Sequence, residues 1–466
     1  IMAMFVGSAI GGYWLAKQFV QNKIFAFICG FIFAFAPFKM ARIEEHYTLI
    51  STVLIPVAFV YFMRSFSFEK FKIFPKIQSK KQLAILYLLG FLCIGFDYVL
   101  TFQLLFLCGL YLSFFYVNKV YVSLKKWHFW LLMFLFFIAM HFVINVLIKH
   151  GVDDRGGLWW SGKWIDFVIP YNSLLYNKLQ IYLLSVFSIQ EQTMESVMFL
   201  GYTFLICTII SLVYVMRNKQ NEYRIKALVF SLLLFVLMTM PVFRIPFCSP
   251  IYPPTAIFHF LPFINNLRCP TRFVLEIMLI APIIIFYVLE NLNITNRYKS
   301  VVGIVLFLFF FVEYIPAGYS RIEKESIPKV YDALAHKTGE SVLVYPLGLR
   351  DGMKLDGRFD IENLYYQTVY HKKKMGGYIS RIEGWIWYVH YQNAFTNTLL
   401  HLEKDSLFVI KPNNYAAAFQ TLKLDYVVIP RRYRCEKAAL FLQNTCSPFV
   451  VQKEEYNGDL LLSLKR

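Results

Sequence analysis

The densest group of chemically useful side chains lies in a short polar link between two apolar runs. Residues 37–46 carry two cations, two carboxylates and an imidazole, namely Lys39, Arg42, Glu44, Glu45 and His46. A carboxylate at Glu44 or Glu45 could act as a general base toward a hydroxyl or hold a metal ion. Arg42 and His46 could bind an anionic phosphate. The alternative is a solvated hairpin with a cluster of surface charges.

A second candidate segment spans residues 149–196. Loops of this length are uncommon unless they are functional or disordered. Asp153 and Asp154 are adjacent in it and could bind a metal or serve as a base, although adjacent acids are common. Trp159, Trp160 and Trp164 are interleaved with glycines. These rings predict either anchors at a membrane surface or a stacking platform for a sugar ring or a lipid-linked substrate.

A third segment, residues 244–272, contains four prolines in its first eleven positions and therefore cannot form a regular helix there. Arg268 and Arg272 are four residues apart at its end and would share a face if the next helix begins early. Together they could clamp a phosphate or a pyrophosphate. The alternative is a pair of arginines that snorkel from a helix end toward water.

Four further ionisable residues fall in or near apolar runs, where charge is costly and is retained mainly beside a cavity or a partner. Asp97 and Glu313 lie near the ends of such runs, whereas His141 and Glu276 lie inside them. Asp97 is a candidate substrate-binding residue. For His141, a hydrogen-bonded packing role is the simpler interpretation.

The elements that must position these residues follow from composition. Hydrophobic residues make up 58% of the chain and charged residues only 16%, which exceeds what one soluble core can bury. Apolar runs long enough to cross a bilayer recur as far as Pro316. We expect about ten spans, at Met2–Phe19, Ile24–Pro37, Tyr47–Met63, Gln82–Tyr98, Leu100–Val117, Trp130–Ile148, Val197–Met216, Ala227–Phe243, Phe273–Leu292 and Val301–Ile315.

Basic residues collect on one side of this ten-span arrangement and predict its orientation. The loops near residues 64–81, 119–126, 217–226 and 297–299 are rich in Lys and Arg and are assigned to the cytoplasm. Loops 39–46, 149–196 and 244–272 then lie outside. Much of the net charge of +18 is explained by this topology, so we expect no nucleic-acid partner.

Residues 317–466 differ from the rest because charges, glycines and short alternating apolar runs predict a folded α/β domain, here on the exterior side. Expected strands are Ser341–Tyr345, Leu424–Ile429, Phe449–Gln452 and Leu460–Leu464, and expected helices are Val330–His336 and Glu436–Leu442. The cysteine pairs Cys248–Cys269 and Cys435–Cys446 could form disulfides in an oxidising compartment. The chain is thus predicted to be a polytopic α-helical membrane protein with a C-terminal α/β soluble domain.

Several segments of this sequence resemble those of the GT-C class of integral-membrane glycosyltransferases, particularly bacterial members with a C-terminal periplasmic domain. The likeness covers most of the chain and is carried by the hairpin with Arg42 and His46, Trp164–Pro170, Leu267–Phe273, Tyr345–Gly348, Tyr365–Thr368, Gly376–Arg381 and Leu424–Ile429. The resemblance implies a bacterial inner-membrane enzyme that transfers a hexose or pentose from a polyprenyl-phosphate donor, with an exterior carboxylate as base. Cations or a divalent metal, Mg²⁺ or Mn²⁺, would stabilise the departing phosphate.

In this class the usual catalytic acid belongs to a first exterior loop, which would precede Ile1. We therefore expect an upstream span and loop, and Glu44 and Glu45 match only the second exterior loop. Two other functions stay open. A non-catalytic scaffold subunit would keep the fold and bind protein partners. A transporter or lipid flippase would need the ionisable residues of the spans to line one continuous path.

Overall fold

The computed structural model describes residues 1–43, 49–68, 75–123, 162–189, 194–218, 222–243, 250–256, 269–318, 327–351, 354–379 and 382–465, with seven further residues between 127 and 138. The chain divides into two compact units, residues Ile1–Ser320 (unit 1) and Arg321–Arg466 (unit 2). The sequence pattern places the change of composition after Pro316.

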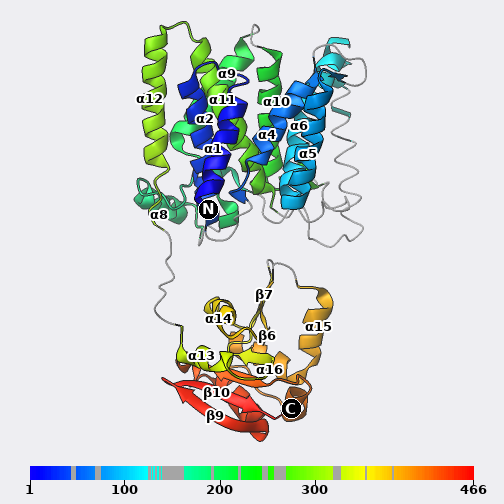
Figure 1. Cartoon of the computed structure of the whole chain (residues 1–466), viewed down its shortest axis with the longest axis vertical. Coiled ribbons are helices and arrows are strands. Elements are labelled where there is room, and N and C mark those ends of the chain that lie inside the picture. Colours follow the sequence, from blue (N-terminus) through cyan, green and yellow to red (C-terminus); the bar gives the residue numbers. More distant parts are fainter. Residues whose placement is uncertain are drawn as a thin grey trace. The chain divides into compact units, whose positions relative to one another are not determined.

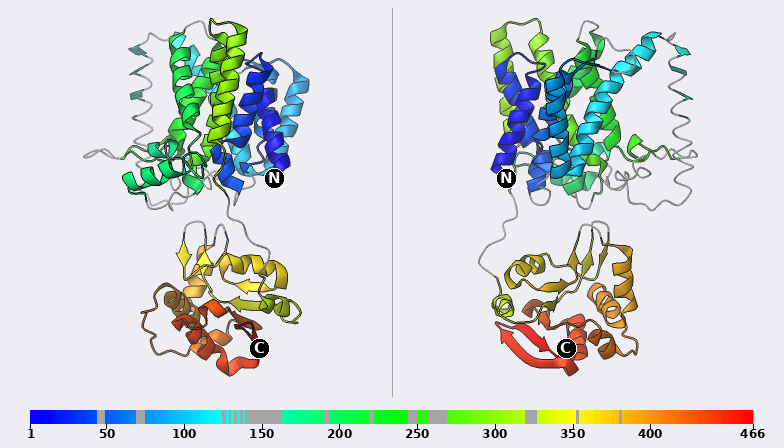
Figure 2. Two further views of the ribbon diagram at one scale, coloured as in Figure 1. Left: turned by 90° about the vertical axis from the view of Figure 1, so that its left-hand side faces the viewer. Right: turned by 45° about the vertical axis from the view of Figure 1, so that its right-hand side comes forward.

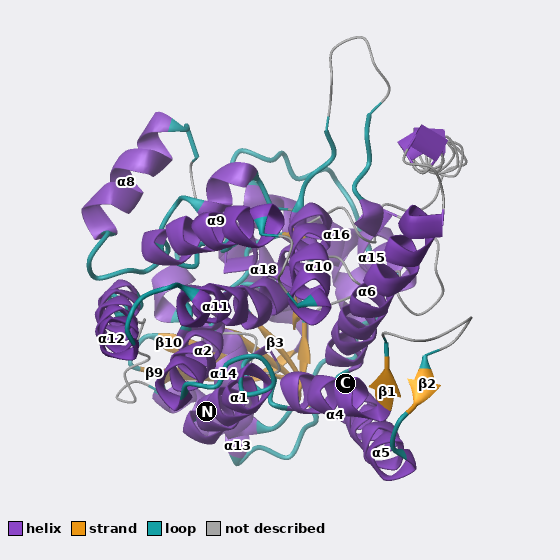
Figure 3. Ribbon diagram, turned by 90° about the horizontal axis from the view of Figure 1, so that it is seen from above, coloured by secondary structure: helices purple, strands orange, loops and turns teal. Residues whose placement is uncertain are grey.

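Unit 1 is a bundle of apolar helices that run side by side (Figures 1 and 3). Its helices are α1 (Met2–Ala16), α2 (Lys23–Phe35), α3 (Pro37–Met40), α4 (Leu54–Ser65), α5 (Lys80–Phe96), α6 (Tyr98–Ser123), α8 (Asn177–Val186), α9 (Tyr202–Arg217), α10 (Tyr223–Thr239), α11 (Val274–Asn291) and α12 (Asn296–Glu313). Helix α8 lies across the end of the bundle instead of along it (Figure 1).

Within the described residues, three helical stretches are long and apolar enough to cross a membrane, Lys23–Ile43, Val99–Lys119 and Pro270–Asn291. Helices α1, α4 and α9 are apolar but shorter. The expected span Trp130–Ile148 falls largely outside the described residues. The helices therefore support an association with a membrane, and the count of ten spans stays a prediction.

Helix α11 is the centre of unit 1. Nearly every residue from Val274 to Leu289 is buried, and the helix packs against α2, α9, α10 and α12. A helix that is apolar on all sides is typical of such a surrounded position. Helices α1 and α2 approach closely because Gly30 faces the α1 backbone, where an added Cβ would lie 2.3 Å from the carbonyl oxygen of Ala9.

Unit 2 is built on a mixed five-stranded sheet of order β6-β3-β8-β10-β9. Strand β3 (Ser341–Val344) pairs in parallel with β6 (Lys373–Met375) and β8 (Tyr426–Ile429), whereas β10 (Asp459–Leu464) is antiparallel to β8 and to β9 (Val450–Tyr456). A second sheet joins β5 (Leu355–Asp356), β4 (Leu349–Arg350) and β7 (Gly377–Tyr378). The mixed α/β character expected for residues 317–466 is confirmed.

Helices cover both faces of the five-stranded sheet. On one face, α13 (Lys329–Ala335) and α14 (Glu362–Tyr370) bury Tyr331, Tyr366 and Tyr370 against Val342 and Val428. The other core brings together α15 (Gly384–Gln392), α16 (Ala394–Lys404), α17 (Tyr415–Gln420) and α18 (Lys437–Cys446). The expected strands and the helices α13 and α18 are present within a few residues of their predicted bounds.

The cysteines expected to form pairs are free thiols where the structure describes them, at Cys269, Cys435 and Cys446. The expected pair Cys435–Cys446 is therefore wrong. Cys446 is the last residue of α18, which begins at Lys437, so the length of the helix keeps the two backbones about 15 Å apart, more than twice the span of a disulfide. The other expected partner, Cys248, lies outside the described residues.

Candidate functional site

Three of the candidate segments, far apart in sequence, meet at one carboxylate. The Arg42 guanidinium lies 3.4 Å from Oε2 of Glu195, and the Arg272 guanidinium lies 2.6 Å from Oε1 of the same side chain. Arg42 comes from the first candidate segment, Glu195 from the second and Arg272 from the third. We call these three residues the arginine–glutamate cluster.

Short irregular elements position this cluster at the ends of apolar helices. Pro37 follows α2 and begins α3, which passes into a 3₁₀ turn at Ala41–Ile43 that holds Arg42. Pro270 begins the 3₁₀ turn Pro270–Phe273, which holds Arg272 and leads into α11. Glu195 lies in the turn Met194–Ser196, which packs against the turn of Arg272. Prolines fit these positions because the first helical residues lack intrahelical acceptors for their N–H groups.

The two arginines differ in their access to solvent. Arg42 is wholly buried and its guanidinium stacks 4.4 Å from the centre of the Phe38 ring, whereas the Arg272 side chain keeps 22% of its surface exposed. The cluster is thus open on the side of Arg272. Two guanidinium groups at one place offer several N–H donors, which suit an anionic ligand.

Polar groups around Arg272 lack partners among the described residues. They are Nε of Arg272 itself, Oε1 of Gln103 and the hydroxyl of Thr271, all buried. Gln103 is fixed beside the cluster because its amide donates to the Arg272 carbonyl at 3.0 Å. Buried polar groups are normally hydrogen-bonded, so such a group of unpaired atoms indicates a place where a polar ligand or water binds.

Two further residues adjoin the cluster. Asp97 accepts a hydrogen bond from the Val99 N–H at 2.7 Å, which caps the start of α6, and its charge also acts on Arg272. Burial raises the pKa of the Cys269 thiol, which contacts Glu195, so the thiol stays protonated and is a poor nucleophile. Asp97 therefore has a structural role that its sequence position alone does not reveal.

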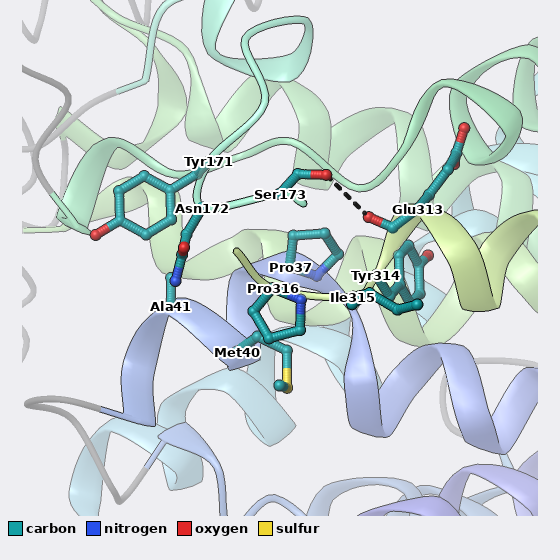
Figure 4. A pocket seen from close by; sticks show the side chains of 10 residues that line it. All are labelled: Pro37, Met40, Ala41, Tyr171, Asn172, Ser173, Glu313, Tyr314, Ile315 and Pro316. Atoms are coloured by element: carbon teal, nitrogen blue, oxygen red, sulfur yellow. Dashed lines mark hydrogen bonds between the residues drawn. The ribbon is translucent and has the colours of Figure 1, made fainter. Parts of the chain in front are cut away.

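A small pocket adjoins α3. Pro37, Met40 and Ala41 line one wall, and the segments Tyr171–Ser173 and Glu313–Pro316 line the rest (Figure 4). The hydroxyl of Ser173 donates to the Glu313 carbonyl across the pocket at 3.4 Å. All of these residues belong to unit 1.

The Glu313 carboxylate at this pocket is held by protein donors. Its Oε1 accepts hydrogen bonds from the Tyr176 hydroxyl (2.9 Å), the Thr203 N–H (3.2 Å) and the Thr203 hydroxyl (3.0 Å). Glu313 therefore ties the end of α12 to the start of α9. Gly201 makes this possible, because it has a φ of +97° and an added Cβ would lie 2.3 Å from Oε2 of Glu313.

Two further ionisable residues of unit 1 are buried, Lys39 in α3 and Glu276 in α11. The Lys39 ammonium donates to the Thr52 hydroxyl at 2.5 Å and lies 4.0 Å from the centre of the Phe33 ring. Lys39 is thus part of the helix packing and not of a solvated hairpin. Glu276 is buried in α11, and neither of its carboxylate oxygens has a hydrogen-bond partner among the described residues.

The structure brings together Arg42, Arg272 and Asp97 from the residues predicted to bind substrate. The other candidates, Glu44, Glu45, His46, His141, Asp153, Asp154, Trp159, Trp160 and Arg268, lie outside the described residues. Within the described part of the chain, no three His, Cys, Asp or Glu side chains gather closely enough to hold a metal ion.

Glu195 is the functional candidate that the pattern does not predict. It belongs to the loop 149–196, but no motif distinguishes it from the neighbouring acids. The signal is its position, since it lies two residues before the buried apolar segment Val197–Leu200. A carboxylate so close to a buried segment needs a partner, and the arginines of the other two segments supply it.

Residues 1–314 match the profile of the family described as "Domain of unknown function (DUF6311)". The chain belongs to the DUF6311 family. The match ends one residue after α12, so the DUF6311 domain coincides with unit 1 up to its last helix and contains the arginine–glutamate cluster. None of the curated proteins compared with the chain matches it.

Proposed function

We propose that this DUF6311 protein is a membrane glycosyltransferase of the GT-C type, which takes a sugar from a polyprenyl-phosphate donor at the non-cytoplasmic face. The arginine–glutamate cluster supports this proposal most directly. Two guanidinium groups from separate segments contact one carboxylate at the ends of apolar helices. A lipid phosphate carries its anionic group at the end of a long apolar chain. The two arginines can bind the anionic group, and the apolar helices can contact the chain.

In this mechanism Arg42 and Arg272 bind the phosphate of the donor and stabilise the charge that develops on it when the sugar leaves. Arginine suits the task because its planar fork of donors matches phosphate oxygens. Glu195 holds the two guanidinium groups in place until the phosphate replaces it. The base toward the acceptor hydroxyl is assigned to Glu44 or Glu45, two and three residues beyond Arg42.

Ten spans, an exterior C-terminal domain and a bacterial inner-membrane location belong to the same proposal. The basic loops near residues 64–81 and 217–226 support the orientation. The three stretches able to cross a membrane support the embedding of unit 1.

The decisive experiment measures binding of polyprenyl phosphate to the detergent-solubilised full chain by native mass spectrometry. We expect Arg272→Ala to raise the dissociation constant by roughly 30- to 150-fold, because a charge-assisted contact to phosphate contributes about 2–3 kcal/mol. Arg272→Lys should recover only part of this loss, since lysine cannot bind bidentately.

Arg224→Ala is the matched control. Arg224 pairs with Glu222 at 3.4 Å on a predicted cytoplasmic loop, so its removal changes the net charge equally without touching the cluster. Equal binding by the wild type and Arg272→Ala would contradict the proposal and favour the scaffold function. Where binding is confirmed, transfer assays with Glu44→Gln and Glu45→Gln test the assignment of the base.

A further inference from the structure

Unit 2 carries an apolar and aromatic surface that its own core does not cover. In the small sheet, Arg350 of β4 is directly opposite Leu355 of β5 and Tyr378 of β7, so these three side chains form one row. Leu355 and Tyr378 are both exposed, and Ile379, next to Tyr378, keeps 60% of its surface exposed. Such a row is unusual for a sheet that faces water.

Helix α15 continues this surface. Trp385, Tyr388 and Val389 follow each other at spacings of three and four residues and therefore share one helix face. Trp385 and Tyr388 are each 63% exposed. The opposite face holds Trp387, which is buried in the core of unit 2. Helix α15 thus has an anchored face and an uncovered aromatic face.

Contacts on the buried side of α15 hold the helix against the small sheet. The Lys354 ammonium, from the β4–β5 connection, lies 4.6 Å from the ring centre of Trp387 and 4.8 Å from that of Tyr391. The Ile382 N–H, just before α15, donates to the Asp351 carboxylate at 3.5 Å. Figures 1 and 2 show unit 2 with β7 in yellow and α15 in orange. We call Leu355, Tyr378, Ile379, Trp385, Tyr388 and Val389 the aromatic patch.

The composition of the aromatic patch fits a lipid headgroup region better than bulk water. Tryptophan and tyrosine are enriched at membrane–water interfaces, where an apolar ring and a polar edge are both satisfied. Arg350 stands in the same row, and its guanidinium lies 5.6 Å from the centre of the Tyr378 ring. A cation at this position suits lipid phosphates. Contiguous exposed apolar surfaces of this kind mark interaction sites.

The chain itself brings such a surface close to unit 2. Helix α12 ends at Glu313, and α13 begins at Lys329. The intervening residues span at most about 50 Å when fully extended. Since unit 1 contains helices able to cross a membrane, unit 2 is tethered near a bilayer, and this raises the effective concentration of lipid at its surface.

We propose that the aromatic patch docks unit 2 on the surface of the lipid bilayer that holds unit 1. The rings of Trp385 and Tyr388 insert at headgroup depth, and Arg350 contacts lipid phosphates. Docking confines the exterior unit to the membrane surface. This inference requires only that unit 1 is embedded in the membrane, so it stands or falls separately from sugar transfer.

The test places a nitroxide label at Val389→Cys in the full chain, with the exposed Cys435 replaced by serine, reconstituted in vesicles of phosphatidylethanolamine and phosphatidylglycerol. Power saturation compares collisions with oxygen, which enters lipid, and with a water-soluble nickel chelate. We expect the label at 389 to favour oxygen. A label at Val451→Cys, which is 70% exposed on β9, should favour the nickel chelate.

The double variant Trp385→Ser/Tyr388→Ser should shift the label at 389 to the aqueous pattern. An unchanged spectrum of the label at 451 in this variant shows that unit 2 remains folded. Equal, aqueous accessibility at positions 389 and 451 in the wild type would overturn the proposal. Exclusion of both reagents at 389 would also overturn it, because a protein surface would then cover the aromatic patch.

Discussion

Two carboxylates of unit 1, Glu195 and Glu313, are both largely buried but are held in different ways. Glu195 is bound by the side chains of Arg42 and Arg272. Glu313 accepts hydrogen bonds from the backbone and hydroxyl of Thr203 and from Tyr176. The first carboxylate contacts two long cationic side chains that have strong affinity for other anions. The second contacts only uncharged donors, from Tyr176 and from Thr203 at the start of α9.

This difference separates an exchangeable acid from a structural one. In the proposed function a phosphate replaces the Glu195 carboxylate, and both arginines keep a charged acceptor after the exchange. No ligand can replace Glu313 without leaving the start of α9 uncapped. Removal of Glu313 should therefore reduce stability, and removal of the charge at Glu195 should change ligand binding.

The largest effect is expected for Glu313→Ala. The Thr203 N–H and the Tyr176 and Thr203 hydroxyls lose their acceptor in a buried setting, which costs roughly 2–4 kcal/mol of unfolding free energy. The apparent melting temperature of the detergent-solubilised chain should fall, and amide hydrogens at the start of α9 should exchange faster. Glu313→Gln is the matched control, because its amide oxygen can keep these bonds. Equal stability of the alanine variant and the wild type would remove the structural role of Glu313.

A smaller effect at the same place is expected for Gly201→Ala. The positive φ disfavours alanine, and the added Cβ would press on Oε2 of Glu313, so we expect a loss of about 1–3 kcal/mol. Gly109 in α6 provides the comparison, since a Cβ there meets no atom within 4 Å. Gly109→Ala should leave the melting temperature unchanged or raise it. A similar response to both substitutions would mean that the contact with Glu313 is unimportant.

Local patterns in the sequence predict most of the architecture. The expected spans of unit 1 overlap helices where the structure describes them, because an apolar run has few alternatives to a helix in a membrane. Two expected spans begin too early, since α4 begins at Leu54 and α9 at Tyr202. In unit 2, the pattern predicts β3, β8 and β10 but not α15. That helix mixes buried Trp387 with exposed Trp385 and Tyr388, so its sequence shows no clean apolar face.

The candidate site is predictable only in part. Arg42 and Arg272 stand out in the sequence because a charge next to an apolar span costs free energy. In the structure both contact Glu195. Glu195 does not stand out, because its importance comes from contacts over 153 and 77 residues of sequence. Such separations leave no periodic signal, and only the packing of three loops reveals the partner.

The smallest effect, and the sharpest test of the comparison, is expected for Glu195→Gln. The amide has nearly the shape of the carboxylate but no charge, so it competes less well for the two guanidinium groups. Binding of polyprenyl phosphate should tighten by about tenfold, a gain of roughly 1.4 kcal/mol. Native mass spectrometry of the wild type and the variant measures this change, and Glu222→Gln is the control for the loss of one negative charge. Weaker binding by Glu195→Gln would mean that the carboxylate organises the arginines for the ligand instead of occupying its place, and Glu195 would then resemble Glu313.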